Sequence, residues 1–266
     1  MRIALGLSYK GSAYNGWQIQ PNVPTVQECL ESSLHQFLNE EVATVCAGRT
    51  DAGVHALCQV VHLDTLKERT NNAWVKGLNA LLPPDIRVSW ACRVSDDFHA
   101  RFSAKSRKYL YVLRNHGVRS PFHINTAGTV FKPLDINAMM KSSKFLLGEH
   151  DFSAFRSSQC QAKSPIRIVH DISIRHSNPY VFITFHANAF LHHMIRNIVG
   201  ALVDIGLNRF EPEWIKEVLE SGNRSASSAT FSPAGLYMIA ATYDEFNLPF
   251  SSDSWNLLYE LTGIKA

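Results

Sequence analysis

The chain has 266 residues, of which 45% are hydrophobic and 18% charged, a composition typical of a folded globular protein and not of a disordered one. A net charge of +3 neither requires nor excludes a nucleic-acid partner. The longest apolar-rich run, residues 195–207, contains an arginine, an asparagine and an aspartate, and is too polar and too short to span a membrane. Because the first residues lack the apolar block of a signal peptide, we expect a cytoplasmic protein.

The first third of the chain predicts the order β-α-β-β-α-β. Residues 2–9 alternate between the two faces of a strand. Residues 25–28 (TVQE) form a capping box, and apolar residues recur at helical spacing from there to Leu38. The remaining elements are strands at 42–47 and 58–64, a helix at 71–82 that two prolines end, and a strand at 86–94.

The rest of the chain repeats this order without a residue-level repeat. Its predicted elements are a strand at 107–115, a helix that Asp135 caps and that ends before Gly148, a hairpin of 166–176 and 180–186, a long helix at 190–206, an additional helix near Pro212 and a closing strand at 236–243.

Two β-α-β-β-α-β units predict two ferredoxin-like halves, and therefore an α+β fold. We expect the halves to form one extended mixed or antiparallel sheet, with helices on one face and a central cleft on the other. The predicted boundaries are 1–104 for an N-terminal lobe, 105–246 for a C-terminal lobe and 247–266 for a tail. Apolar residues in the tail indicate that it docks on the body: Trp255, Leu257, Leu258 and Tyr259.

The segment 47–55 (AGRTDAGVH) places Asp51 two residues after Arg49, in a loop bounded by Gly48 and Gly53. An aspartate in such a loop is usually a turn former, because its side chain bonds the local backbone. The adjacent arginine and the apolar segments on both sides make Asp51 a candidate catalytic residue as well.

Basic and aromatic residues alternate just after the first half, at Lys105, Arg107, Lys108, Tyr109, Tyr111, Arg114 and Arg119. Such a pattern suits a phosphate backbone with stacked bases. It suits a solvated strand edge equally well.

Arg196 interrupts an otherwise apolar predicted helix. An arginine is rarely buried without a partner, so a carboxylate such as Asp51 would pair with it and lower the carboxyl pKa by about 1–3 units. The alternative is an arginine at the helix edge that reaches solvent. His192 and His193 precede it, but adjacent helical residues diverge and no HExxH motif occurs, so we expect no metal.

Other chemistry-bearing motifs are missing from the sequence. No GxGxxG, Walker-type or GxSxG loop occurs, and the five cysteines form no CxxC pair. We therefore expect reduced thiols, no zinc, and no cofactor. What remains is a reaction built on a carboxylate, an arginine and a tyrosine.

Several motifs in order resemble the tRNA pseudouridine synthases of the A type, the TruA family. The resemblance covers residues 3–245 and rests on the segments 14–18 (YNGWQ), 47–55 (AGRTDAGVH), 97–102 (DFHARF), 151–155 (DFSAF), 187–197 (ANAFLHHMIRN) and 235–237 (GLY). It implies the pseudouridine synthase fold and an isomerase that converts a uridine in RNA to its C-glycoside isomer without a cofactor.

The resemblance also implies residue roles. Asp51 matches the family nucleophile, and Arg196 the arginine that pairs with it. Arg49 matches the arginine that enters the space left by the flipped nucleotide. Tyr109 matches the tyrosine that stacks on the target base and is placed for the final proton transfer, and Leu236 matches a residue that packs on the uracil from the other side.

The implied substrate is the anticodon stem-loop of tRNA, at several neighbouring uridines near its 3′ side. The implied assembly is a homodimer whose subunits share one tRNA, with no membrane and no small-molecule cofactor. Two alternatives compete with this prediction. A non-catalytic RNA-binding module would carry RNP-type aromatics, and an RNA hydrolase with an aspartate nucleophile would need a second carboxylate or a metal.

Overall fold

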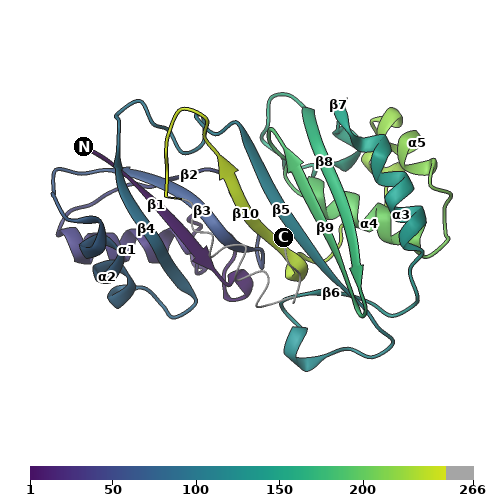
Figure 1. Ribbon diagram of the computed structural model, residues 1–266, viewed down its shortest axis with the longest axis horizontal. Helices are drawn as coiled ribbons and strands as arrows, with labels where there is room; N and C mark the ends of the chain where they lie inside the picture. The colour runs from purple at the N-terminus through teal and green to yellow at the C-terminus, as the bar shows by residue number, and fades with distance from the viewer. Residues whose placement is uncertain (250–266) are drawn as a thin grey trace. The chain divides into compact units, whose positions relative to one another are not determined.

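A computed structural model describes residues 1–249 (Figure 1). The predicted docking residues of the tail, Trp255 to Tyr259, lie outside this range. Within it the chain is α+β, and its strand pairing is mixed but mostly antiparallel, as predicted. Backbone contacts divide the described residues into two compact units, a first unit of residues 1–105 and 238–249, and a second unit of residues 106–237. No helix in the described range is long and apolar enough to cross a membrane.

The first unit has the predicted element order. It contains β1 (Arg2–Tyr9), α1 (Val26–Leu38), β2 (Val45–Cys46), β3 (His55–Asp64), α2 (Asn71–Leu81) and β4 (Ile86–Val94). Strand β1 lies between β4 and β3, and β2 pairs with β3, with every pairing antiparallel. Strands β1 and β2 are therefore separated by β3, which is the arrangement of a split β-α-β unit.

Side-chain caps begin the two helices of the first unit. Thr25 Oγ1 accepts a hydrogen bond from the backbone N–H of Glu28 at 3.4 Å, and Thr70 does the same for Ala73 at 3.2 Å. Helix α1 ends at Leu38, and the next residue, Asn39, caps it in the left-handed conformation. Each helix buries one apolar face, and the rings of Phe37 and Trp74 meet edge to face at 5.3 Å where α1 and α2 pack.

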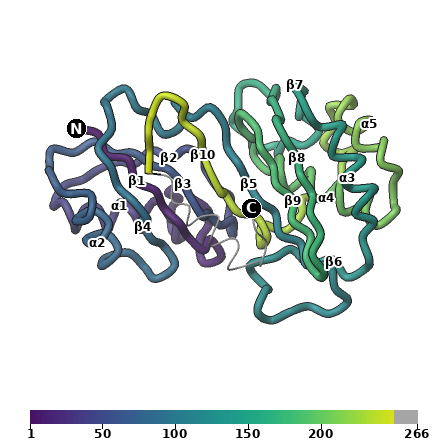
Figure 2. Tube along the Cα trace, viewed as in Figure 1, coloured from purple at the N-terminus to yellow at the C-terminus, as the bar shows by residue number. Residues whose placement is uncertain are grey.

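The second unit contains β5 (Ser106–Asn115), β6 (Gly128–Val130), α3 (Ile136–Ser143), β7 (Gly148–Asp151), β8 (Ile166–Ser177), β9 (Tyr180–Ala187), α4 (Met194–Gly206) and α5 (Trp214–Ser221). Its strands lie in the order β5-β9-β8-β7, all antiparallel, with β6 parallel to β5. Helix α3 packs against α4, α5 and β8 (Figure 2). Strand β10 (Leu236–Thr242) begins in this unit and continues into the first.

Two predicted helices are longer than the observed ones. The predicted helix 190–206 begins only at Met194, because His193 has a φ of +64° and cannot continue a right-handed helix toward its N-terminus. Helix α3 ends at Ser143, and a 3-10 turn of residues 144–146 leads to Gly148 at φ +96°, which begins strand β7. Strands β6 and β7 escaped prediction because both are short and β7 is polar throughout.

Candidate active site

Asp51 lies in the loop that joins β2 to β3 in the first unit. The backbone N–H of Val54 donates to the carbonyl of Asp51 at 3.1 Å, and Gly53 takes a φ of +77°, so the segment 51–54 is a tight turn. Asp51 is partly exposed, Arg49 is exposed, and Thr50 between them is buried. The loop therefore presents two charged side chains to solvent and anchors itself through the residue between them.

The loop after β1 supports the Asp51 loop. The N–H of Gly53 donates to the carbonyl of Tyr14 at 3.2 Å, and the N–H of Trp17 donates to the carbonyl of Thr50 at 3.0 Å. Gly16 has a φ of +92°, and a Cβ at this position would lie 2.7 Å from the Thr50 carbonyl oxygen. Only glycine permits this approach. The YNGWQ motif therefore has a structural role, which is to hold the Asp51 loop.

Tyr109 lies on β5 of the second unit, opposite Phe185 of β9. Its ring meets the edge of Phe190 at 5.2 Å with an interplanar angle of 80°, and only 7% of the residue is exposed. The neighbouring Tyr111 differs in role, since it is fully buried and its hydroxyl donates to the carbonyl of Ser232 at 2.6 Å. The structure therefore assigns Tyr111 to the core and leaves Tyr109 as the candidate stacking residue.

Arg196 occupies the first turn of α4 and is half-buried. Its Nε donates to the carbonyl of Phe231 at 2.9 Å, and the N–H of Phe231 donates to the carbonyl of Arg196 at 3.1 Å. The two residues thus bond in both directions, which fixes the plane of the guanidinium group. Neither of the two predictions for Arg196, a buried pair or a solvent-exposed edge, included this contact.

The loop that carries Phe231 is tied to α4 by Arg224. Its Nη2 donates to Asn197 Oδ1 and to Thr230 Oγ1, each at 3.1 Å. Asn197 is fully buried, and its Nδ2 donates to the carbonyl of Phe155 at 2.8 Å. The DFSAF segment, the ANAFLHHMIRN segment and the loop before β10 therefore meet at one polar cluster. Arg224 was missed because a single arginine in a serine-rich loop follows no pattern.

Leu236 begins β10 and is 5% exposed. The preceding Gly235 lies so close to β5 that a Cβ would be 2.2 Å from the carbonyl oxygen of Val112. Substitution of this glycine would displace the start of β10, and with it Leu236. The GLY motif is explained by this close approach.

His192 and His193 require a correction. The expectation that they diverge assumed a helix through both residues, but α4 begins at Met194. Their rings instead face one another at 4.0 Å with an interplanar angle of 37°. The left-handed backbone of His193 is the cause.

The predicted site residues divide between the two units. Arg49 and Asp51 share one loop of the first unit, while Tyr109, Arg196 and Leu236 belong to the second. The pairing of Asp51 with Arg196 stays a prediction.

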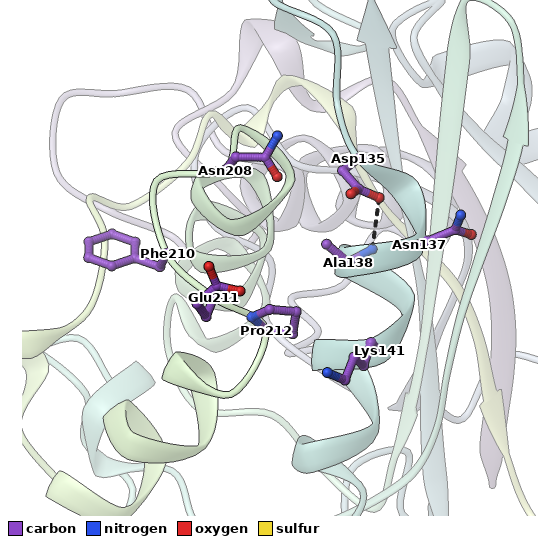
Figure 3. Close-up of a pocket in the computed structure, with 8 residues that line it drawn as sticks. All are labelled: Asp135, Asn137, Ala138, Lys141, Asn208, Phe210, Glu211 and Pro212. Atoms are coloured by element: carbon purple, nitrogen blue, oxygen red, sulfur yellow. Dashed lines mark hydrogen bonds between the residues drawn. The ribbon is translucent and has the colours of Figure 1, made fainter.

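A cavity of about 300 Å³ lies in the second unit (Figure 3). Two ionic groups on its wall have protein partners, since Asp135 Oδ1 accepts the N–H of Ala138 at 3.0 Å and Lys141 Nζ pairs with Glu213 at 2.7 Å. None of the predicted site residues line it; the wall consists of Asp135, Asn137, Ala138, Lys141, Asn208, Phe210, Glu211 and Pro212.

Comparison with known proteins identifies the class. The family described as tRNA pseudouridine synthase matches residues 7–103 and 143–244. The tRNA pseudouridine synthase A of Bordetella petrii is 51% identical over 264 residues, covering 98% of each chain. Those of Janthinobacterium sp. and Burkholderia mallei are also 51% identical, covering 93% and 94% of this chain and 94% and 93% of their own.

The chain belongs to the tRNA pseudouridine synthase family. It is an enzyme, an isomerase with tRNA pseudouridine synthase A activity, and the resemblance drawn from the sequence motifs is confirmed. Both alternatives, a non-catalytic RNA-binding module and an RNA hydrolase, are set aside. Among solved structures, a chain from a crystal structure of a Cbf5-Nop10-Gar1 complex aligns with 13% identity and a TM-score of 0.37, over 97% of this chain and 66% of that chain, a likeness too low to support a conclusion.

Proposed function

We propose that this enzyme isomerises uridines in the anticodon stem-loop of tRNA, with Asp51 as the nucleophile. The observation that carries the proposal is the Asp51 loop, in which a partly exposed carboxylate stands on a backbone fixed by hydrogen bonds and by Gly16. A nucleophile needs this combination of access and fixed orientation.

The reaction needs no oxidant, reductant or energy source. The Asp51 carboxylate adds to the nucleotide, the N1–C1′ bond breaks, the uracil rotates, and C5 bonds to C1′. The proton leaves C5, N1 gains a proton, and Asp51 is released. A carboxylate is ionised at neutral pH, so the protein has to orient it rather than deprotonate it.

Arg49 fits the role of holding open the RNA stack. A stacked uridine exposes neither face to a carboxylate, so the base must flip out, at a cost of a few kcal/mol. The exposed guanidinium of Arg49, two residues from Asp51, is placed to bond the phosphates or the bases left behind. This offsets part of the cost of flipping.

The second unit supplies the other groups of the proposed mechanism. Tyr109 stacks on the target uracil and takes the C5 proton, while Leu236 packs on the other side of the base. Arg196, oriented by Phe231, pairs with Asp51 and keeps the carboxylate ionised. We further propose that the two ferredoxin-like halves form a central RNA-binding cleft, and that a homodimer binds the tRNA.

The test is Asp51→Ala, assayed by tritium release from tRNA labelled at C5 of uridine. We expect complete loss of turnover with tRNA binding retained, because the side chain takes part in the covalent chemistry. Glu68→Ala removes an exposed carboxylate from another loop of the same unit and should leave turnover at the wild-type level. Residual turnover in Asp51→Ala contradicts the nucleophile assignment.

A further inference from the structure

Two buried polar side chains that the mechanism does not use hold the residues on either side of Arg49, one through the backbone of Gly48 and the other through the side chain of Thr50. Gln59 of β3 is fully buried, and its Nε2 donates to the carbonyl of Gly48 at 2.5 Å. The N–H of Gly48 in turn donates to Gln59 Oε1 at 3.4 Å. The side-chain amide therefore makes both bonds that a residue of a neighbouring strand would make to Gly48.

Tyr9 makes the second contact with the loop. It is the last residue of β1, is 4% exposed, and its hydroxyl lies 2.8 Å from Thr50 Oγ1. Burial raises the pKa of Tyr9, so the hydroxyl stays protonated at neutral pH. The pairing of β1 with β3 is irregular between Leu7 and Tyr9, as is common beside active sites.

Holding Gly48 and Thr50 determines where their neighbours lie. Thr50 is drawn into the core, so Arg49 on one side and Asp51 on the other are left at the surface. The entropy cost of ordering this backbone is met during folding and not when tRNA binds. Misplacement of a reacting group by about 1 Å lowers a rate by about 100-fold.

We propose that Tyr9 and Gln59 are positioning residues that clamp Gly48 and Thr50 and so present Asp51 in its reactive orientation before the substrate arrives. The proposal rests on the proposed role of Asp51 as the nucleophile. The competing explanation is that both side chains serve only the stability of the first unit. A positioning role lowers kcat and leaves the KM for tRNA unchanged, whereas a purely structural role lowers stability alone.

The test compares Tyr9→Phe with Tyr243→Phe. Tyr243 is a matched control because it is also a buried tyrosine of the first unit, and its hydroxyl donates to the carbonyl of Ala100 at 2.6 Å, away from the loop. We expect both variants to lose a similar amount of thermal stability. Only Tyr9→Phe should lower kcat, by roughly 10-fold or more, with KM within about 2-fold of wild type.

Thr50 allows the same bond to be tested from its other end. Thr50→Val removes the hydroxyl and should reproduce the kcat loss, while Thr50→Ser keeps it and should restore turnover. Wild-type kcat in both Tyr9→Phe and Thr50→Val, or an equal kcat loss in Tyr243→Phe, overturns the clamp. Asp51→Ala, measured in parallel, separates the two proposals. Turnover in Asp51→Ala contradicts the role of Asp51 as the nucleophile. An inactive Asp51→Ala together with a fully active Tyr9→Phe contradicts only the proposed positioning role of Tyr9 and Gln59.

Discussion

At the scale of single residues, neighbouring side chains in the Asp51 loop differ in solvent exposure. Arg49 is exposed and Thr50 is buried, and this alternation separates the side chain proposed to contact RNA from the one that anchors the loop. Sequence could predict Arg49 and Asp51, because they stand in one contiguous motif. It could not predict Tyr9 and Gln59, since each occupies an ordinary strand position and their importance depends on contacts with residues 11 to 41 positions away.

Another residue-scale feature, His62, makes stability depend on pH. The ring is 5% exposed, and its Nδ1 accepts the N–H of Ala100 at 3.1 Å, which requires an unprotonated nitrogen. Burial, with Arg2 and His99 nearby, lowers the pKa of His62 to about 4. Because the unfolded chain binds a proton near pH 6.5 that the folded chain does not, this stabilisation is complete above pH 6.5 and is lost as the pH falls toward 4.

We expect the His62 contribution to fall by at most about 1.4 kcal/mol for each pH unit in that window. Urea unfolding between pH 7 and 4.5 measures it. His62→Gln keeps an acceptor for Ala100 but does not titrate, and its stability should change less with pH. His35→Gln, at an exposed histidine of α1, should follow the wild-type curve. Parallel curves for wild type and His62→Gln would refute this account.

At the scale of elements, the helices and long strands were predictable and the turns between them were not. The start of α4 is the clearest case, since Phe190 and Leu191 continue the apolar stripe of the helix although they precede it. Periodicity detects which residues share a face, but it does not detect a positive φ at His193. Periodicity also could not predict the structure of the loop before β10, because serines and Arg224 attach this loop to α4 through side-chain hydrogen bonds.

Arg224 is the link through which this loop positions Arg196. We expect Arg224→Met to lower the free energy of unfolding by about 1.5–3 kcal/mol, because it removes charged hydrogen bonds to the buried Asn197. Turnover should fall as well, since Phe231 no longer holds the guanidinium of Arg196. Thermal unfolding and tritium release measure the two effects. Arg209→Met breaks only an exposed pair with Asp204 and should change stability by less than about 1 kcal/mol. Equal effects of the two variants contradict this role.

At the scale of the whole molecule, the modest net charge conceals an uneven distribution. Residues 98–134 contain no aspartate or glutamate, and they hold seven basic residues, Arg101, Lys105, Arg107, Lys108, Arg114, Arg119 and Lys132. The rest of the chain is therefore net negative. Arg107 fits neither explanation left open for the basic and aromatic segment, because it is buried and bonds the carbonyl of Asn188. Arg119 is exposed and lies over the ring of Phe131 at 5.8 Å.

This distribution predicts salt-dependent tRNA binding. Each phosphate contact adds about 0.7–0.9 to the slope of log K against log salt concentration. We expect Lys132→Ala, at an exposed position of the acid-free segment, to reduce the slope by about 1 or less and to weaken binding of all tRNAs alike. Lys67→Ala removes an exposed lysine from the first unit and should leave the slope unchanged. Filter binding at several salt concentrations measures these slopes. Equal slopes for Lys132→Ala and wild type would count against contact between this segment and tRNA.

The close approach of Gly16 to the Asp51 loop also bears on when the enzyme becomes active during its synthesis. The loop is held by Tyr9 and Gly16, which precede it in the chain, and by Gln59, which follows it. A growing chain therefore cannot form all the contacts that hold the Asp51 loop until β3 has left the ribosome and paired with β1. Until then the emerging chain contains Asp51 and Arg49 without the fixed loop, and the proposed site also waits for Tyr109, Arg196 and Leu236 of the second unit.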